Sequence, residues 1–352
     1  MAESDSLPGQ GKKVCVTGAS GFIGSNLVKL LLDRGYHVRG TVRDATDEAK
    51  TSWIRDLGEG TPGTLELFSA DLNKPGSFDE AVEGCEFVCH VASVVRLSVP
   101  NPQSVVDAAL EGTRNVFASI LKHKTAKKVV VTSSVAAIID YINNKDRLLT
   151  EDDWNRDLSL KDPYPMGKTL AERYAWKTVE DMKGQDWSFD LVTICPAMVF
   201  GKATRRAHVR TSLSVIKQLM DGWLFMAPDL HFGIVHVDDV VLAHALALEK
   251  DTAKGRYILC NGDTMSMLEM AAVIKKKYPN AKTPTYTMPN ALTYVVSLMV
   301  PGTSIEVLKR NLSKIPRFDK SKSEKELGLQ YHSSEDCILD TAASILTLGE
   351  KK

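Results

Sequence analysis

Short apolar runs alternate with helical patterns through the first half of the chain. Rich in β-branched residues, these runs predict strands at 13–17, 37–42, 65–69, 87–92, 128–132 and 190–194. The helical spacing between them predicts helices at 22–33, 46–57, 76–83, 103–123 and 165–183. Continuous apolar strands that alternate with helices are typical of a parallel sheet covered on both faces. The sequence therefore predicts a doubly wound α/β fold, which binds ligands at the carboxyl ends of its strands.

Composition excludes several classes of protein. The chain has 352 residues, and its 44 Lys and Arg balance its 44 Asp and Glu, so no global charge attracts nucleic acid or an anionic membrane. No apolar run approaches the roughly 20 residues that span a bilayer. The N-terminus lacks the pattern of a secretory or mitochondrial signal, and the six scattered cysteines fit a reducing compartment. We expect a cytoplasmic protein without nucleic-acid or membrane partners.

A glycine motif, VTGASGFIG, joins the first predicted strand to the first predicted helix. Gly18 allows a tight turn, Gly21 lets the backbone approach a pyrophosphate, and Gly24 lets helix and strand pack closely. The free N–H groups and the positive dipole of the helix start hold phosphates. The first gap is one residue longer than in G-x-G-x-x-G, but the strand and helix around it predict a dinucleotide site. The other loop residues expected at the cofactor are Ser20, Phe22 and Ile23.

The end of the second strand indicates which dinucleotide is bound. NAD sites usually place an acid there, whereas Arg43 can bind a 2′-phosphate and Lys50 can add charge. Asp44 is the counter-argument, because it could serve as the NAD-type acid, and a solvated Arg43–Asp44 pair is the plain alternative. On the position of Arg43 we predict NADP(H). Asp71 and Leu72 follow the third strand and are expected near the adenine, unless Asp71 is a turn residue.

Two further signals concern catalysis. Tyr164 and Lys168 are four residues apart near the start of a predicted helix, so both project from one face. An ammonium near a phenol lowers its pKa, which would make Tyr164 a proton donor near neutral pH. Ser133 and Ser134 follow the fifth strand, where a hydroxyl can hydrogen-bond a substrate carbonyl oxygen. A solvated helix face and a capping serine explain each signal alone, but their order after the glycine motif indicates a catalytic site.

The chain carries, in order, TGASGFIG, TVRD, ADL, HVA, TSS and YPMGK, and this set resembles the extended short-chain dehydrogenase/reductase superfamily. The stretches GSFDEAVEGCEFVCHVAS, KTLAERYAWK and IVHVDDVVLAHALALE resemble its branch of dihydroflavonol 4-reductase and cinnamoyl-CoA reductase. The resemblance runs from about residue 12 to 345. It implies that Tyr164 is the general acid, that Lys168 lowers its pKa and that Ser134 polarises the carbonyl. It also implies cofactor contacts from Tyr164 and Lys168 and from Arg43, Lys50, Val91, Ala92, Ser93, Pro196 and Val199.

The chain departs from these relatives in the substrate region. Dihydroflavonol reductases have an asparagine where this chain has Ile139 and a glutamine where it has Gly233. Around the tyrosine it reads DPYPMGK, not the NWYCY-type block of cinnamoyl-CoA reductases. These changes predict a more apolar pocket with modest discrimination between similar substrates. A substrate wall and ordinary core are equal interpretations of Met220, Trp223, Leu224, Phe225 and Met226.

The regular alternation of strand and helix patterns changes after Pro196. Patterns there predict a helix at 238–248, a strand at 256–260 and a helix at 266–278. We expect a flexible tail at 1–11 and a Rossmann domain at 12–196 that also takes in 231–262. The segments 197–230 and 263–345 would form a smaller C-terminal substrate-binding lobe.

Two groups of polar residues after the sixth strand have no clear place in this chemistry. The basic run is interpreted as a mobile solvated segment, with a substrate phosphate or carboxylate as its alternative partner; it comprises Lys202, Arg205, Arg206, His208 and Arg210. His236 and His244 do not have metal-binding spacing, so no metal site is expected. His236 is instead interpreted as part of a strand-to-helix turn.

The sequence predicts an NADPH-dependent reductase of a ketone or aldehyde. One alternative is a nucleotide-sugar epimerase or dehydratase with tightly held NAD, and another is a 3β-hydroxysteroid dehydrogenase-like oxidation. A non-enzymatic dinucleotide sensor is disfavoured, because such proteins typically lack the Tyr–Lys pair. The protein is expected to be a monomer or a homodimer. By analogy of fold, a dimer would pack helices 103–123 and 165–183 as a four-helix bundle.

Overall fold

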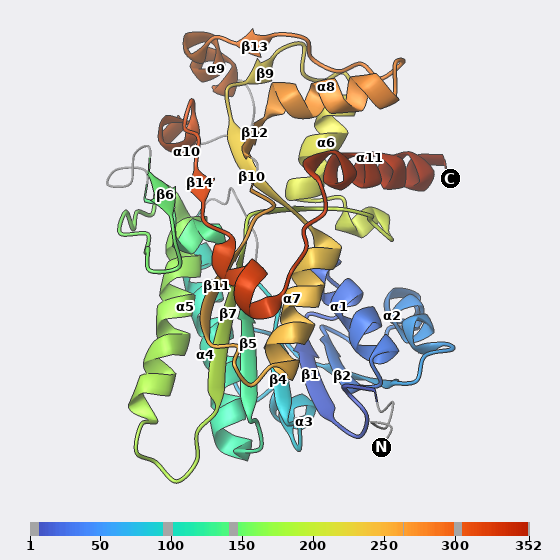
Figure 1. Cartoon of the computed structure of the whole chain (residues 1–352), viewed down its shortest axis with the longest axis vertical. Helices are drawn as coiled ribbons and strands as arrows, with labels where there is room; N and C mark the ends of the chain where they lie inside the picture. The colour runs from blue at the N-terminus through green and yellow to red at the C-terminus, as the bar shows by residue number, and fades with distance from the viewer. Residues whose placement is uncertain (1–6, 94–100, 141–146, 263, 299–304, 351–352) are drawn as a thin grey trace.

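A seven-stranded parallel sheet forms the centre of the protein in the computed structural model, which describes residues 7–93, 101–140, 147–262, 264–298 and 305–350 (Figure 1). From one edge to the other its strands are β11 (Gly255–Leu259), β7 (Asp190–Pro196), β5 (Lys128–Thr132), β4 (Phe87–His90), β1 (Lys13–Thr17), β2 (His37–Val42) and β3 (Thr64–Ser69). The order reverses between β1 and β4, and such a switch point is where doubly wound sheets bind their ligands. The predicted fold class is confirmed.

Alternation along the central strands divides the core into two layers. Val14 and Val16 of β1 face one layer and Cys15 faces the other, because successive side chains of a strand point to opposite faces. In β5, Val130 joins the first layer, whereas Val129 and Val131 join the second. The three central positions of these strands are all apolar because both faces of the sheet are covered.

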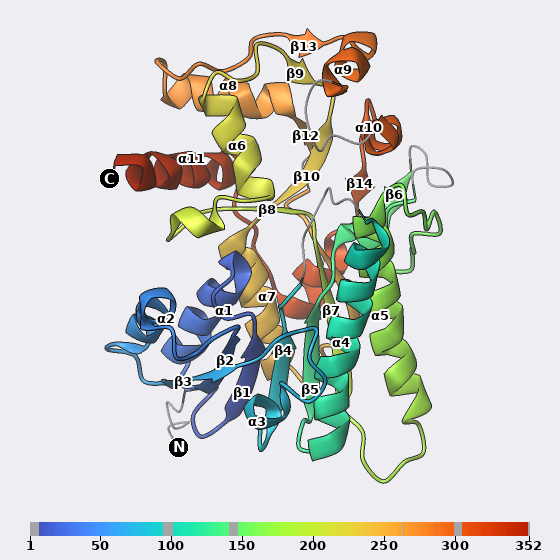
Figure 2. The same cartoon turned by 180° about the vertical axis from the view of Figure 1, so that it is seen from behind.

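Helices cover both faces of the sheet (Figure 2). On one face lie α1 (Phe22–Asp33), α2 (Glu48–Arg55) with the 3-10 turn η1 (Asp56–Gly58), and α7 (Val237–Glu249). On the other lie α3 (Asp79–Val82), α4 (Gln103–His123) and α5 (Pro163–Asp181). Helices α4 and α5 run side by side over their length. Whether they also form a dimer interface stays a prediction.

Several predicted boundaries were wrong, for local reasons. Strand β4 ends at His90 instead of residue 92, because the amides of Val91 and Ala92 donate to the side chain of Thr17 instead of a neighbouring strand. Helix α5 begins at Pro163, two residues before the predicted start; proline suits the first helical position because its missing N–H would have no partner there. Helix α3 is also shorter than predicted, whereas α4 has the predicted bounds.

A second group of elements follows β7. Strands β8 (Met198–Phe200), β10 (His231–His236) and β12 (Thr264–Ser266) form a three-stranded sheet. Around them pack α6 (Ser212–Met220), α8 (Met267–Lys277) and α11 (Ser334–Glu350), which share an apolar cluster with Phe200 and Ile234. The remaining elements are β6 (Leu148–Leu149), β9 (Ala227–Pro228), β13 (Thr287–Met288), β14 (Arg317–Phe318), α9 (Asn290–Ser297), α10 (Ile305–Asn311) and the turns η2 (Val135–Ala137), η3 (Arg206–His208) and η4 (Ser323–Leu327).

The segment 231–262 is divided between these two groups. Strand β10 pairs with β8 and β12 outside the large sheet, whereas α7 covers the large sheet and β11 forms its edge. The predicted division into a Rossmann domain and a smaller lobe therefore stays a prediction. The prediction assigned β10 to the Rossmann domain, whereas in the structure this strand pairs with β8 and β12.

None of the helices in the described ranges is long and apolar enough to cross a bilayer. The six cysteines all lie within those ranges, where they are buried and form no disulfide.

Candidate active site

The glycine motif forms a tight loop between β1 and α1. Gly18 has a φ of +72°, and a Cβ atom there would lie 3.0 Å from the Cα of Ala92. A Cβ on Gly24 would lie only 2.1 Å from the carbonyl oxygen of Gly18. Gly21 is the N-cap of α1 and offers no side-chain cap, and the first turn of the helix contains no acidic residue. The N-terminus of α1 therefore fits a phosphate, which the free N–H groups and the helix dipole favour.

Thr17 and His90 hold the ends of β1 and β4 together beside this loop. The Thr17 hydroxyl oxygen accepts hydrogen bonds from the amides of Val91 and Ala92 at 3.1 and 3.0 Å. Its Oγ1 also lies 2.9 Å from Nδ1 of His90. Burial, with a smaller effect of Lys168, lowers the pKa of His90 to about 3, so the imidazole is neutral. Of the predicted cofactor contacts here, Val91, Ala92 and Ser93 follow directly after β4.

The residues after β2 favour a 2′-phosphate over a ribose hydroxyl. Arg43 is exposed and has no hydrogen-bond or ion-pair partner among the described residues. The Asp44 carboxylate instead accepts hydrogen bonds from the amide and the hydroxyl of Thr46, at 2.9 and 2.7 Å. These bonds hold the pKa of Asp44 below its usual value and occupy the acid that an NAD site would use. Lys50 is exposed and pairs with Asp47.

Asp71 behaves as a turn residue. Its carboxylate accepts from the backbone amide of Asn73 at 2.9 Å. Leu72 packs against Gly112 of α4, and its carbonyl oxygen accepts from Asn115 at 2.7 Å. Leu72 also lines a cavity between the sheet and helices α4 and α5. Ser93 and Lys168 line the same cavity. The predicted adenine contacts of Asp71 and Leu72 stay predictions.

The basic run after β7 differs from the predicted mobile segment. His208 is buried, and its Nε2 lies 3.2 Å from the carbonyl oxygen of Ser20 in the glycine loop. Its ring packs against Phe22 and Trp53, and the guanidinium of Arg205 lies over Trp53 at 4.8 Å. Lys202 and Arg210 are exposed, as expected of a solvated run. Part of this segment therefore covers the start of α1.

Ser134 and Tyr164 meet at the carboxyl end of β5. Ser134 caps the short turn η2, where its hydroxyl oxygen accepts from the Ala136 amide at 3.1 Å. The Ser134 hydroxyl lies near the phenol of Tyr164, on the first turn of α5, where it favours the phenolate. The structure thus brings together two residues that are 30 positions apart in the sequence.

Burial has the largest effect on the pKa of Tyr164 in this structure, and the predicted lowering of that pKa by Lys168 stays a prediction. Burial raises the pKa of the Tyr164 phenol, because it desolvates the phenolate, and the nearby Ser134 hydroxyl offsets part of this effect. The Nζ of Lys168 donates to the carbonyl oxygen of Thr132 at 3.0 Å. Burial lowers the pKa of Lys168 itself to about 8, although the nearby Glu172 carboxylate opposes this shift.

Glu172 is a buried residue beside the candidate site that the sequence analysis did not single out. Its buried carboxylate accepts hydrogen bonds from Ser133, at 2.5 Å, and from Thr193, at 2.8 Å. It also pairs with the Nε of Arg256 on β11 at 2.7 Å. The spacing of Tyr164, Lys168 and Glu172 places all three on one face of α5, and this regular spacing was the available signal.

The positions that suggested an altered substrate pocket lie beside an apolar cluster. A Cβ on Gly233 would lie 2.8 Å from the ring of Phe318, so the Phe318 ring leaves no room for a side chain there. Ile139 is half-buried against the same cluster, which includes Phe318 and Cys260.

The predicted substrate wall is split by the structure. Met220 and Leu224 pack against the core around α6 and α8, whereas Trp223 and Phe225 are 76% and 88% exposed. The core interpretation therefore holds for Met220 and Leu224, and a substrate wall at Trp223 and Phe225 stays a prediction. Pro196 and Val199, both expected at the cofactor, are buried at the end of β7 and in β8.

Comparison with known proteins supports this arrangement. Residues 15–263 match the model of the 3-beta hydroxysteroid dehydrogenase/isomerase family. The chain is 38% identical over 351 residues to the cinnamoyl-CoA reductase CAD2 of Medicago truncatula, covering 97% of each protein. It is 37% identical over 291 residues to an anthocyanidin reductase of Vitis vinifera, covering 78% of this chain and 83% of that protein. A crystal structure of Gre2 from Candida albicans in complex with NADPH superposes with a TM-score of 0.78 at 27% identity, covering 96% of this chain and all of the other.

The chain therefore belongs to the 3-beta hydroxysteroid dehydrogenase/isomerase family, within the extended short-chain dehydrogenases/reductases. Inside that superfamily it lies in the branch of dihydroflavonol 4-reductase-like and cinnamoyl-CoA reductase-like proteins.

Proposed function

We propose that this protein reduces a ketone or an aldehyde with NADPH, and that Tyr164 donates the proton. It is an NADP-dependent oxidoreductase that acts on carbonyl-type substrates. The observation that carries the proposal is that Ser134, Tyr164 and Lys168 come together at the carboxyl end of β5, where Lys168 donates to the carbonyl oxygen of Thr132.

The residues around α1 and β2 would hold the dinucleotide. The loop at Gly18, Gly21 and Gly24 would hold a pyrophosphate at the N-terminus of α1, where no side chain caps the helix. The exposed Arg43 would bind the 2′-phosphate, since Asp44 is engaged by Thr46. When bound, NADPH supplies the hydride that adds to the carbonyl carbon and is itself oxidised.

The side chains of the site would manage the carbonyl oxygen and its proton. The Ser134 and Tyr164 hydroxyls would both donate hydrogen bonds to the oxygen, which stabilises the negative charge that develops there. Tyr164 would then transfer its proton to that oxygen, giving the alcohol. The phenol is protonated at neutral pH, and its burial raises the pKa, so proton donation would depend on groups that stabilise the phenolate. The Lys168 ammonium would stabilise the phenolate that remains.

The substrate is proposed to present an apolar group beside its carbonyl. Ile139 and Val135 pack against the cluster of Phe318, which also fills the space beside Gly233. Two of the similar proteins are named for reduction of an anthocyanidin and of cinnamoyl-CoA, both aromatic compounds. An aromatic aldehyde or ketone is therefore the first substrate class to test.

The cofactor preference can be tested by fluorescence titration of the purified protein with NADPH and NADH. We expect wild type to bind NADPH at least about tenfold more tightly, and Arg43→Ala to remove that difference. Arg114→Ala, which changes an exposed arginine on α4, should leave it intact. Tighter binding of NADH, or NAD that copurifies with the protein, would favour the epimerase or NAD-linked dehydrogenase alternatives instead.

Catalysis can be tested with aromatic and aliphatic aldehydes and ketones. Wild type should oxidise NADPH in their presence, and Tyr164→Phe should lose at least about 100-fold in kcat while keeping its NADPH affinity. Unchanged turnover would remove Tyr164 from the mechanism. Tight NADPH binding with no turnover on any carbonyl would favour a dinucleotide sensor.

A further inference from the structure

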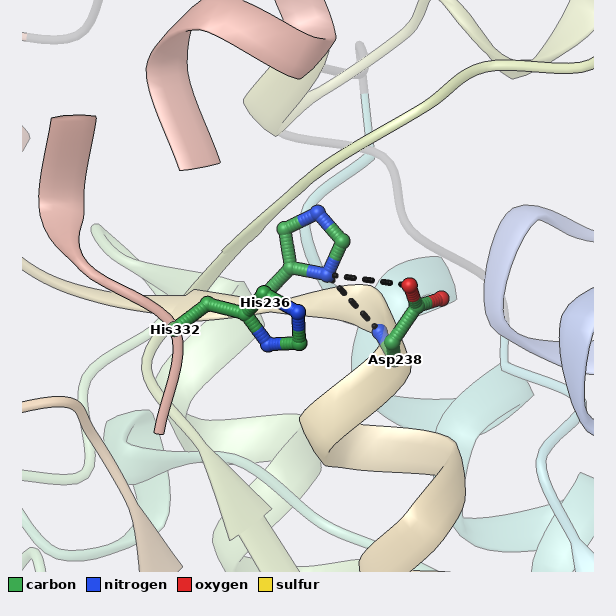
Figure 3. Close-up of side chains that lie close together, drawn as sticks. All are labelled: His236, Asp238 and His332. Atoms are coloured by element: carbon green, nitrogen blue, oxygen red, sulfur yellow. Dashed lines mark hydrogen bonds and ion pairs between the residues drawn. The ribbon is translucent and has the colours of Figure 1, made fainter. Parts of the chain in front are cut away.

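Two histidines and an aspartate meet where β10 runs into α7 (Figure 3). His236 ends β10 and caps α7, and Asp238 lies in the first turn of that helix. His332 comes from the segment just before α11. The two imidazole rings are stacked with their centroids 4.4 Å apart. One ligand atom from each of the three residues lies within 4.8 Å of the others.

The far side of each imidazole faces a carboxylate. Nδ1 of His332 lies 2.6 Å from the buried Asp239, which also accepts the backbone amide of His332 at 3.0 Å. This holds the ring with its other nitrogen toward His236 and Asp238 (Figure 3). The buried Nε2 of His236 has no hydrogen-bond partner, and Oδ2 of Asp340 lies 3.4 Å away. Histidines that bind metals usually have a carboxylate or carbonyl at the nitrogen opposite the metal.

The near side of the cluster places acceptor atoms against one another. Nδ1 of His236 accepts the backbone amide of Asp238 at 3.2 Å, a long hydrogen bond. The same nitrogen lies 3.5 Å from Oδ2 of Asp238, and two acceptors at that distance share no hydrogen when the imidazole is neutral. A cation between them would remove this repulsion and replace only one long hydrogen bond.

The surroundings also favour a cation with access from solvent. The His236 side chain is only 2% exposed, whereas Asp238 and His332 are 62% and 43% exposed, so one ligand is rigid and two border water. Asp336 adds negative charge near both histidines. Two imidazoles and one carboxylate form a donor set that suits Zn²⁺ and similar ions better than Mg²⁺ or Ca²⁺.

We propose that His236, Asp238 and His332 form a binding site for a divalent transition-metal ion, with water in the remaining coordination positions. The ion would tie the start of α7 to the segment that leads into α11. Helix α11 is the last element of the chain and packs through Cys337 and Ile338 against the core beside β10. The site therefore would act on the stability of this junction, separately from the chemistry at Tyr164.

The test uses the full-length protein with its affinity tag removed and its metals stripped with a chelator. Isothermal titration with ZnCl₂ should show one saturable site, whereas MgCl₂ should show none. His332→Gln and Asp238→Asn change exposed side chains and should fold, and each should weaken Zn²⁺ binding at least about tenfold. The matched control is His231→Gln, because His231 also pairs with a single carboxylate, Asp229, at 2.8 Å. It should bind Zn²⁺ as wild type does.

A second readout separates the proposed site from adventitious binding. Saturating Zn²⁺ should raise the Tm of wild type and of His231→Gln, but not that of His332→Gln. No saturable Zn²⁺ binding by wild type would overturn the proposal. So would a His332→Gln variant that binds Zn²⁺ with the wild-type affinity, or a loss of binding that is equal in His231→Gln.

Discussion

The hydroxyl of Ser133 donates a hydrogen bond of 2.5 Å to the buried carboxylate of Glu172. Ser133 directly precedes Ser134, and Glu172 lies one helical turn after Lys168 on α5. The same carboxylate pairs with Arg256 at 2.7 Å, so one buried group connects β5, α5 and β11. The backbone that carries Ser134 and the helix that carries Tyr164 are therefore joined through a charge that water does not reach.

Glu172→Gln should destabilise the protein strongly. The substitution leaves the Arg256 guanidinium buried without its counter-charge, which typically costs about 3–5 kcal/mol. Urea denaturation would measure the free energy of unfolding. The control is Glu111→Gln, which removes a surface pair with Arg114 and should cost less than about 1 kcal/mol. Equal losses in the two variants would show that the buried pair is not important for stability.

Lys168→Met should stabilise the fold and abolish carbonyl reduction. Burial lowers the pKa of Lys168 to about 8, below the 10.5 of a free lysine, so below pH 8 the fold holds an unfavourable buried ammonium. Between these two pKa values the unfolded chain binds more protons, and this lysine makes stability rise with pH. Removing it should therefore stabilise the fold at pH 7 by up to about 3 kcal/mol, less the lost hydrogen bond to Thr132.

The gain from Lys168→Met should be smaller at pH 9 than at pH 7, since the wild-type amine is then largely neutral. Denaturation at both pH values would measure it, and the same variant should lose carbonyl reduction. Lys29→Met, at an exposed pair with Asp33, should show no such dependence. A gain that grows with pH would contradict this account of the buried ammonium.

Gly24→Ala should weaken both the fold and dinucleotide binding. Alanine is the better helix former by about 1 kcal/mol, but here its Cβ would lie 2.1 Å from the carbonyl oxygen of Gly18. The backbone must shift, and we expect NADPH affinity to fall at least about tenfold because the pyrophosphate loop moves with it. Gly349→Ala is the matched control in α11, where the added carbon would meet no atom within 4 Å beyond the local helix backbone and its two neighbours in the chain. It should leave the Tm unchanged or raise it.

Ile139→Asn should change substrate preference without changing the cofactor site. The amide would lie half-buried against the apolar cluster around Phe318, where it costs free energy unless the substrate offers a hydrogen-bond partner. We expect kcat/KM for apolar carbonyls to fall about 3- to 30-fold, while hydroxylated aromatic carbonyls lose less. Steady-state kinetics on both substrate types, with NADPH titration as a check, would measure this. An equal loss on both would argue that Ile139 does not face the substrate.

The local parts of the site were predictable from the sequence. The glycine motif, the serine after β5 and the Tyr164–Lys168 spacing each depend on a few neighbouring residues, and strand–turn–helix order fixes which edge of the sheet they share. The strands of the large sheet were also predictable, because burial on both faces leaves continuous apolar runs. The ends of the strands were less predictable. Strand β4 ends where the hydroxyl of Thr17, far away in the sequence, accepts hydrogen bonds from two backbone amides.

Contacts between distant segments were decided only by the tertiary structure. No local pattern places Arg256 beside Glu172, His208 against the glycine loop, or His332 on His236. The pKa of Tyr164 belongs to the same class, because it depends on how deeply the phenol is buried and on where the Lys168 amine points. Periodicity and motif spacing record the environment of a residue along its own element. Contacts with residues from distant segments, and the desolvation that these contacts cause, form only when the chain folds.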